Sequence, residues 1–160
     1  MVLKNMENED EIGFGGGNDS RNSLQKAAMT AIYDVLTCID MKEDINVENI
    51  VSALLDAPYE ECDYFVKAAV VLSIRDMDKI VSKYNANMNK WTFDRLNRVE
   101  QAILLLSYVH FYYIEPDVQK GVVIDIAVKL AKLYLGDKDY KFVNAILDHV
   151  LLREESKDEE

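Results

Sequence analysis

At the centre of the predicted fold lies the stretch Asn97-Arg98-Val99-Glu100-Gln101-Ala102-Ile103-Leu104-Leu105-Leu106. Asn97 followed three residues later by Glu100 has the spacing of a capping box, which satisfies backbone amides at the start of a helix. The residues that follow are almost entirely apolar, and a helix that is apolar on all sides is typical of the middle of a helical domain. We therefore expect a buried central helix that runs to Tyr113 and ends at Pro116.

Helical periodicity of apolar residues continues on both sides of this stretch. It predicts helices over residues 24–39, 47–55 and 58–84, a short apolar piece over 91–96, and helices over 122–135 and 137–151. Expected first-turn and capping residues are Ser20 or Ser23, Asn46, Pro58, Gly136 as a left-handed C-cap, and Asp137 or Asp139. About seven helical pieces with short connections favour an all-α fold of two small bundles that share one core.

The two ends of the chain differ in composition from its body. Residues 1–19 combine acidic side chains with Gly13-Phe14-Gly15-Gly16-Gly17, and we expect a disordered tail there, with a second acidic tail at 154–160. The domain then spans residues 20–153. The net charge of −11 divides into −4 in residues 1–20, −3 in residues 151–160 and −4 in the body between them. Electrostatic attraction to phosphates supplies most of the nonspecific affinity of proteins for nucleic acid. The body has a negative net charge and therefore has no overall attraction for such a polyanion.

No pattern of catalytic, cofactor-binding or metal-ligating residues is found. Cys38 and Cys62 are too far apart for a zinc motif, and His110 and His149 lack the spacing of a metal site or catalytic triad. The triple glycine has neither the preceding strand nor the GK[ST] of a phosphate-binding loop. No apolar run has the length of a membrane span or signal peptide. We expect a cytoplasmic protein that is not an enzyme and has no cofactor or metal.

One stretch of the chain is basic. Lys67, Arg75, Lys79 and Lys83 fall on multiples of four and so share one face of a continuous helix, and Arg95 and Arg98 follow. This stripe is either a solvated helix face or a surface for phosphates or an acidic partner. Nearby tyrosines at positions 108, 112 and 113 are spaced so that at least one points away from the core.

Four ordered motifs occupy the last third of the chain. They are Trp91…Arg95-Leu96, Val99-Glu100…Ile103-Leu104, Ile124-Asp125…Ala127-Val128…Leu130-Ala131-Lys132 and Lys141-Phe142-Val143-Asn144…Leu147-Asp148. They resemble the W…RL, V-E…IL, INEAVELAK and KFVNGVLD stretches of the NusB family of bacterial transcription antitermination factors. The resemblance extends in architecture over about residues 20–150 and implies a NusB-like double helical bundle.

The resemblance also implies a function. Members of the family pair with the small-subunit ribosomal protein NusE, and the pair binds boxA RNA of nascent ribosomal RNA transcripts within the RNA polymerase antitermination complex. By resemblance, the candidates at the partner surface are Arg95 and Glu100, and the candidate RNA contacts are Arg21, Lys26, Tyr33 and Lys141. Glu100 has an equally good interpretation as a capping residue.

The sequence departs from the family pattern where RNA binding usually resides. Family members often carry an arginine-rich run leading into the first helix, whereas Ser20–Ala27 contains only Arg21 and Lys26 as basic residues. Asp125 and Ile126 also replace an asparagine and a glutamate. Loss of phosphate contacts lowers both affinity and its salt dependence. The alternative function is therefore a NusB-like protein-interaction scaffold with weak or lost RNA binding. A homodimer is also possible.

Overall fold

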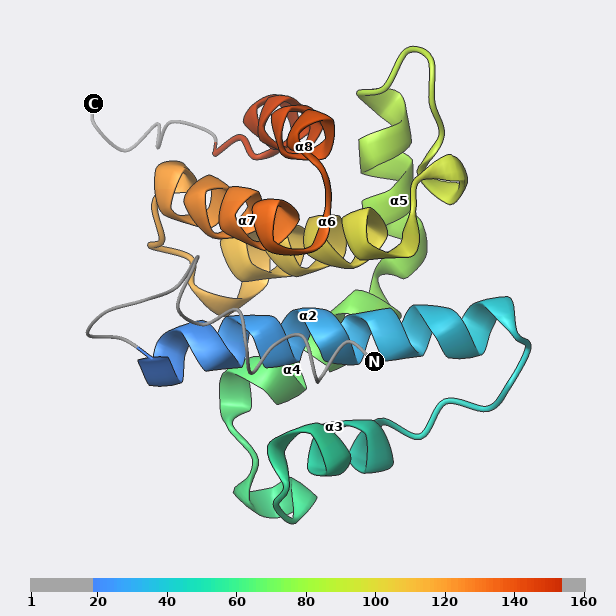
Figure 1. The fold of residues 1–160 in the computed structure, drawn as a ribbon, viewed down its shortest axis with the longest axis vertical. Coiled ribbons are helices and arrows are strands. Elements are labelled where there is room, and N and C mark those ends of the chain that lie inside the picture. Colours follow the sequence, from blue (N-terminus) through green and yellow to red (C-terminus); the bar gives the residue numbers. More distant parts are fainter. Residues whose placement is uncertain (1–18, 154–160) are drawn as a thin grey trace, which may run out of the picture.

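The computed structural model describes residues 19–153, which form an all-helical domain (Figure 1). The described part contains the seven α-helices α2 (Asp19–Asp40), α3 (Val47–Leu55), α4 (Tyr64–Arg75), α5 (Met77–Ala86), α6 (Arg98–Val109), α7 (Lys120–Tyr134) and α8 (Asp137–Val150). Two short 3-10 turns, η1 (Tyr59–Glu61) and η2 (Phe93–Arg95), and a π-helical segment, η3 (His110–Ile114), complete it. The predicted all-α class is confirmed. The predicted tails lie outside the described residues, except that Asp19 already belongs to α2.

Two groups of helices meet along α2 and α6. α2 packs against α3 and α4 on one side and against α6 on the other, while α7 packs on both α6 and α8. Figure 1 shows α3 and α4 below or behind α2, and α5 to α8 above it. The buried apolar side chains of both groups form a single cluster. The predicted arrangement of two bundles that share one core is therefore confirmed.

The central helix is buried as its sequence predicts. Ala102, Ile103, Leu104 and Leu105 are fully inaccessible to solvent. Asn97 caps the helix, because its side-chain oxygen accepts a hydrogen bond of 2.8 Å from the backbone amide of Glu100. Burial of four adjacent apolar residues requires partners on every side, and α2, α4, α7 and α8 supply them.

The prediction of one long helix from Pro58 to Tyr84 is wrong. The chain forms a 3-10 turn at Tyr59–Glu61, begins α4 after the N-cap Asp63, and changes direction at Asp76, whose φ of −111° and ψ of 20° are not helical. The break at Asp76 lets the apolar face of α4 and the apolar face of α5 pack against different helices. Val66 and Ala69 are buried on α4, which packs on α2, whereas the Tyr84 hydroxyl on α5 reaches α6. Tertiary packing overrides the continuous helical pattern here.

Gly136 is also not the left-handed C-cap that the sequence predicts. Its φ of −83° is in the ordinary extended region, and it serves as the N-cap of α8. The Asp139 carboxylate accepts a hydrogen bond of 3.3 Å from the Gly136 amide, so the alternative of Asp139 as a capping residue is confirmed. The helix before it, α7, ends instead at Tyr134, and its C-cap is Leu135, whose backbone is extended.

The described residues contain no helix with the length and apolar character needed to cross a membrane. Within the same part of the chain, no three His, Cys, Asp or Glu side chains come together in a way that would hold a metal ion.

Candidate partner surface and nucleic-acid interface

The two candidate partner residues lie together in one pocket. This Trp91 pocket has a volume of about 490 Å³ and lies where η2 meets the first turns of α6 and α8. Its lining consists of Trp91, Arg95, Leu96, Glu100, Lys138, Asp139 and Phe142. Trp91 was assigned no role in binding from its sequence, yet 55% of its surface is exposed. An exposed tryptophan that lines a surface pocket is typical of an anchor for a partner protein.

Glu100 is part of the cap of α6. Its carboxylate accepts a hydrogen bond of 2.5 Å from the Asn97 side-chain amide, and only 6% of the residue is exposed. In a full capping box the carboxylate also meets the backbone amide of Asn97, and that amide likewise favours the ionised carboxylate here. Burial raises the pKa of Glu100, the nearby charge of Asp139 raises it further, and the hydrogen bonds from Asn97 oppose this. The capping interpretation is confirmed in this modified form, and contact with a partner stays a prediction.

Three of the candidate RNA contacts lie on α2, in different environments. Arg21 is exposed at the start of the helix and forms an ion pair of 3.5 Å with Glu115. Lys26 is buried, with 1% of its surface exposed. Tyr33 is half-buried, and the guanidinium of Arg98 lies 5.5 Å from the centre of its ring. Of these three residues on α2, only Arg21 therefore presents a charge to solvent.

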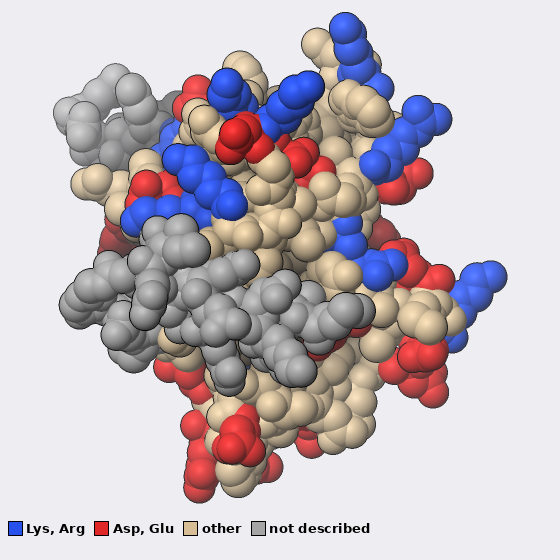
Figure 2. All heavy atoms as spheres, viewed as in Figure 1, with Lys and Arg blue, Asp and Glu red and all other residues tan. Residues whose placement is uncertain are grey.

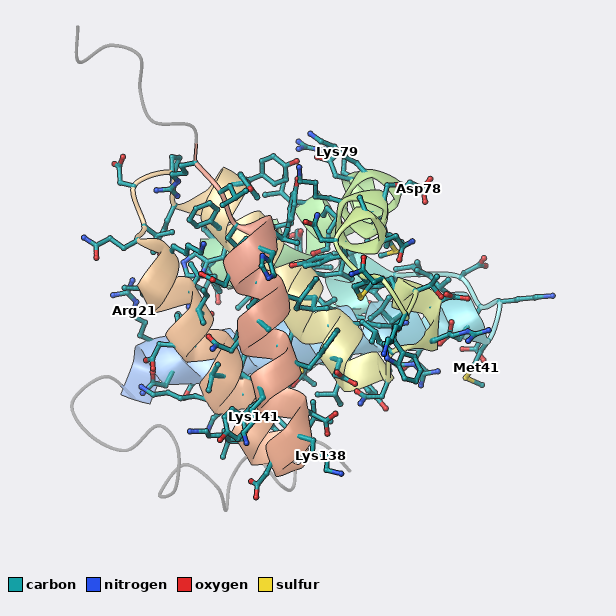
Figure 3. The ribbon with its side chains drawn as sticks, turned by 90° about the horizontal axis from the view of Figure 1, so that it is seen from above. Arg21, Met41, Asp78, Lys79, Lys138 and Lys141 are labelled. Atoms are coloured by element: carbon teal, nitrogen blue, oxygen red, sulfur yellow. The ribbon has the colours of Figure 1, made fainter. Side chains whose placement is uncertain are left out.

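The fourth candidate, Lys141, projects from α8. It is exposed and lines a second pocket of about 490 Å³ together with Asp125, Tyr140 and Asn144. Figure 3 shows Arg21 and Lys141 on different helices and well apart. The structure thus brings Arg95 and Glu100 together but does not gather the four RNA candidates into one cluster.

Arg21 also belongs to a charged group around a buried histidine. The Glu115 carboxylate lies 3.2 Å from Nε2 of His110, and the edge of the His110 ring contacts Phe65. Burial lowers the pKa of His110, although the charge of Glu115 acts in the opposite direction. The folded state therefore prefers the neutral imidazole.

We expect this histidine to make folding stability fall with acidification. The imidazole of the unfolded chain has the ordinary pKa of about 6.5, and that of the folded chain has a lower pKa. Between these two pKa values the unfolded chain binds the proton more readily, so the free energy of unfolding falls as the pH is lowered through this range. One such proton contributes at most about 1.4 kcal/mol per pH unit. Urea unfolding at pH 7.5 and 5.5 should show a smaller loss in His110→Gln than in the unchanged protein. Equal losses of unfolding free energy in the two proteins would contradict this assignment. Burial raises the pKa values of Glu100 and Asp34, so these groups change stability in the opposite direction, and comparing the two proteins cancels their contribution.

The basic stripe predicted on one helix face is divided by the break at Asp76. Lys67 is turned toward Tyr59, where its Nζ donates to the backbone carbonyl at 3.2 Å. Arg75 forms an ion pair of 3.0 Å with Asp76, while Lys79 and Lys83 continue along α5. Figure 2 shows one face of the molecule. Lysine and arginine side chains lie there mainly over α5 to α8, and the side chains near α3 are mostly acidic. Residues 40–63 contain eight acids and one lysine.

The comparisons with known proteins agree with the fold and the motifs. The model of the NusB family matches residues 22–152. The Transcription antitermination protein NusB of Finegoldia magna is 34% identical over 140 residues, which cover 86% of this chain and 97% of the relative.

Solved structures share the same fold. The structure "T. maritima NusB, P3121, Form 2" has a TM-score of 0.68 at 25% identity and covers 82% of this chain and 89% of its own. A chain of the "Crystal Structure of a Plectonemic RNA Supercoil" is similar in fold, with a TM-score of 0.64 at 24% identity over 81% of this chain and 92% of its own. This chain therefore belongs to the NusB family, whose members are non-enzymatic transcription factors.

Proposed function

We propose that this chain is a transcription antitermination factor that pairs with the ribosomal protein NusE in the bacterial cytoplasm. The pair would bind boxA RNA of nascent ribosomal RNA transcripts within the RNA polymerase antitermination complex. Membership of the NusB family supports the general role. The observation that carries the pairing is the Trp91 pocket, which places an exposed tryptophan beside the two residues assigned to the partner by resemblance, Arg95 and Glu100.

Charge supports a basic partner. The chain has a net charge of −11, and its acidic side chains are not confined to the ends, since residues 40–63 alone carry eight. A protein that binds RNA through a basic partner does not need a strongly basic surface of its own. Complementary charge would also speed the encounter of the two proteins.

The structure also supports a second candidate function, a protein-interaction scaffold with weak or lost RNA binding. Lys26 is 1% exposed, and the charge of Arg21 is partly offset by Glu115. Under this alternative the partner surface is retained while the α2 contacts with RNA contribute little. The two candidates differ in their affinity for boxA RNA.

Calorimetric titration with purified NusE tests the pairing. We expect a one-to-one complex with Kd below the micromolar range, and absence of binding at micromolar concentration would contradict the proposal. Sedimentation velocity on the chain alone and on the mixture shows in addition whether a homodimer competes with the complex.

Fluorescence anisotropy across a salt series tests RNA binding, with boxA and scrambled RNA, each with and without NusE. We expect preferential boxA binding by the complex, and Arg21→Gln should reduce the slope of log affinity against log salt by about 0.7, the contribution of one phosphate on a single strand. The matched control is Lys42→Gln, because Lys42 is exposed in the acidic stretch that follows α2. Equal and weak binding of both RNAs in all conditions would favour the scaffold instead.

A further inference from the structure

A group of basic side chains lies on the opposite side of the molecule from Lys141. Lys79 and Lys83 of α5 form one wall of a pocket of about 770 Å³, which we call the α5 pocket, and Leu152 and Arg153 form part of its lining. Ser82, Ala86, Tyr108 and Tyr112 complete the lining, and none of the lining residues is acidic. In Figure 3 the labelled Lys79 and Lys141 project from opposite edges of the domain.

The lysines of this pocket are not paired directly with carboxylates of the described residues, although Lys79 is near enough to Asp76 to help lower the pKa of that carboxyl. Lys79 and Lys83 form no ion pair with them, and Lys79 Nζ instead donates to the Tyr113 hydroxyl at 3.3 Å. The two lysines are four residues apart on one helix and therefore about one turn from each other. Arg75 differs from them, because Asp76 offsets its charge.

Arg153 is fixed in place without losing its charge. Its Nη2 donates to the backbone carbonyls of Phe111 at 2.7 Å and Glu115 at 3.3 Å, and its guanidinium lies 4.1 Å from the centre of the Phe111 ring. Carbonyl oxygens satisfy hydrogen bonds but carry no net charge. The guanidinium therefore still contributes a positive potential to the pocket.

The chain segment that carries Arg153 is also held by a tyrosine. The Tyr112 hydroxyl accepts a hydrogen bond of 3.0 Å from the Leu152 amide and lies 2.8 Å from the Val150 carbonyl, to which it donates. This places the end of α8 across from α5. Leu152 and Arg153 are therefore held in place at the pocket, which lowers the entropic cost of binding there.

We infer that the α5 pocket binds phosphate groups of an RNA strand whose boxA segment is held by the complex with NusE, and this inference rests on the proposed function. Lysine acts as a point charge and suits phosphate, whereas bidentate recognition of a carboxylate needs an arginine fork, and carbonyls already occupy part of the Arg153 fork. The net charge of −11 opposes recruitment of a free polyanion. A strand that is already bound elsewhere overcomes this, because tethering presents its phosphates at an effective concentration on the order of millimolar.

The test compares two RNAs bound to the NusE complex of the full chain, boxA alone and boxA extended at both ends by unstructured nucleotides. We expect tighter binding and a steeper salt dependence for the extended RNA. Lys79→Gln/Lys83→Gln should remove this gain, on the order of tenfold in low salt, and reduce the slope by about 1.4, two phosphates at about 0.7 each. The affinity for boxA alone should not change.

Lysine acetylation read by mass spectrometry gives a direct second measurement. Lys79 and Lys83 should be protected by the extended RNA and not by boxA alone, while Lys42 should stay equally reactive. Lys42→Gln is the matched control for affinity, and circular dichroism checks that the variants fold. All variants keep Glu154 and Glu155, which follow Arg153 in the sequence, so that their charge is common to every comparison.

The outcomes separate the inference from the proposed function. If the unchanged complex binds boxA but the lysine variants keep the full gain from extension, the inference is wrong and the proposed function stands. If the unchanged complex binds neither RNA, both are wrong. Protection of Lys79 and Lys83 by polyglutamate but not by extended RNA would make the pocket a site for an acidic protein and overturn the inference.

Discussion

Trp91→Ala is expected to weaken binding of NusE by at least about 2 kcal/mol, or roughly 30-fold in Kd. Trp91 presents 55% of its surface to solvent at the edge of a pocket between η2, α6 and α8. Aromatic side chains that enter a partner from such a position commonly dominate the binding energy. Because the side chain is largely exposed, its loss should leave the free energy of unfolding nearly unchanged.

Calorimetry with NusE and urea unfolding measure these two quantities on the same variant. Tyr64→Ala is the matched control, since Tyr64 is an aromatic residue that is 72% exposed on α4, away from the Trp91 pocket. It should leave NusE binding unchanged. An unaltered Kd in Trp91→Ala, or an equal loss in both variants, would show that the partner binds elsewhere.

Tyr84→Ala is expected to lower the free energy of unfolding by about 3–5 kcal/mol, the range for removal of a large buried aromatic side chain. Tyr84 is fully buried on α5, and its ring stacks on Phe93 at 6.0 Å and meets Tyr108 edge-on at 6.2 Å. Its hydroxyl donates a hydrogen bond of 2.6 Å to the Leu104 carbonyl. The residue therefore joins α5 to the central helix and to η2.

Tyr84→Phe separates the hydroxyl from the ring. It keeps the ring and removes the hydrogen bond, so the expected loss is only about 0.5–1.5 kcal/mol. Urea unfolding of both variants at pH 7.5 measures these values. A loss below about 1 kcal/mol in Tyr84→Ala would mean that α5 is not anchored to the core through this residue.

Much of the helical pattern could be predicted because its causes are local. The apolar run of α6 and the cap formed by Asn97 lie within one short stretch of sequence. The break at Asp76 has no such signal, because no proline or glycine lies near it. It exists because α4 packs on α2 while the Tyr84 hydroxyl of α5 binds the Leu104 carbonyl of α6.

The candidate site could also be predicted only in part from the sequence. The family resemblance pointed to Arg95 and Glu100, and the structure places both at one pocket. The Trp91 side chain was expected in a short apolar piece, whereas the structure leaves 55% of its surface exposed. Spacing could not show that Lys26 is buried either, because a residue's accessibility depends on what packs over it.

By itself, the sequence determined the all-α class, most helix positions, the family resemblance and the small number of basic residues in Ser20–Ala27. The tertiary structure alone decided where the long predicted helix breaks, which charges are paired, and that Arg153 lies in the same pocket as Lys79 and Lys83. The physical reason is distance along the chain. Helix periodicity and caps act over a few residues, whereas Arg153 is placed by Tyr112, Phe111 and Glu115 through contacts that span about forty residues.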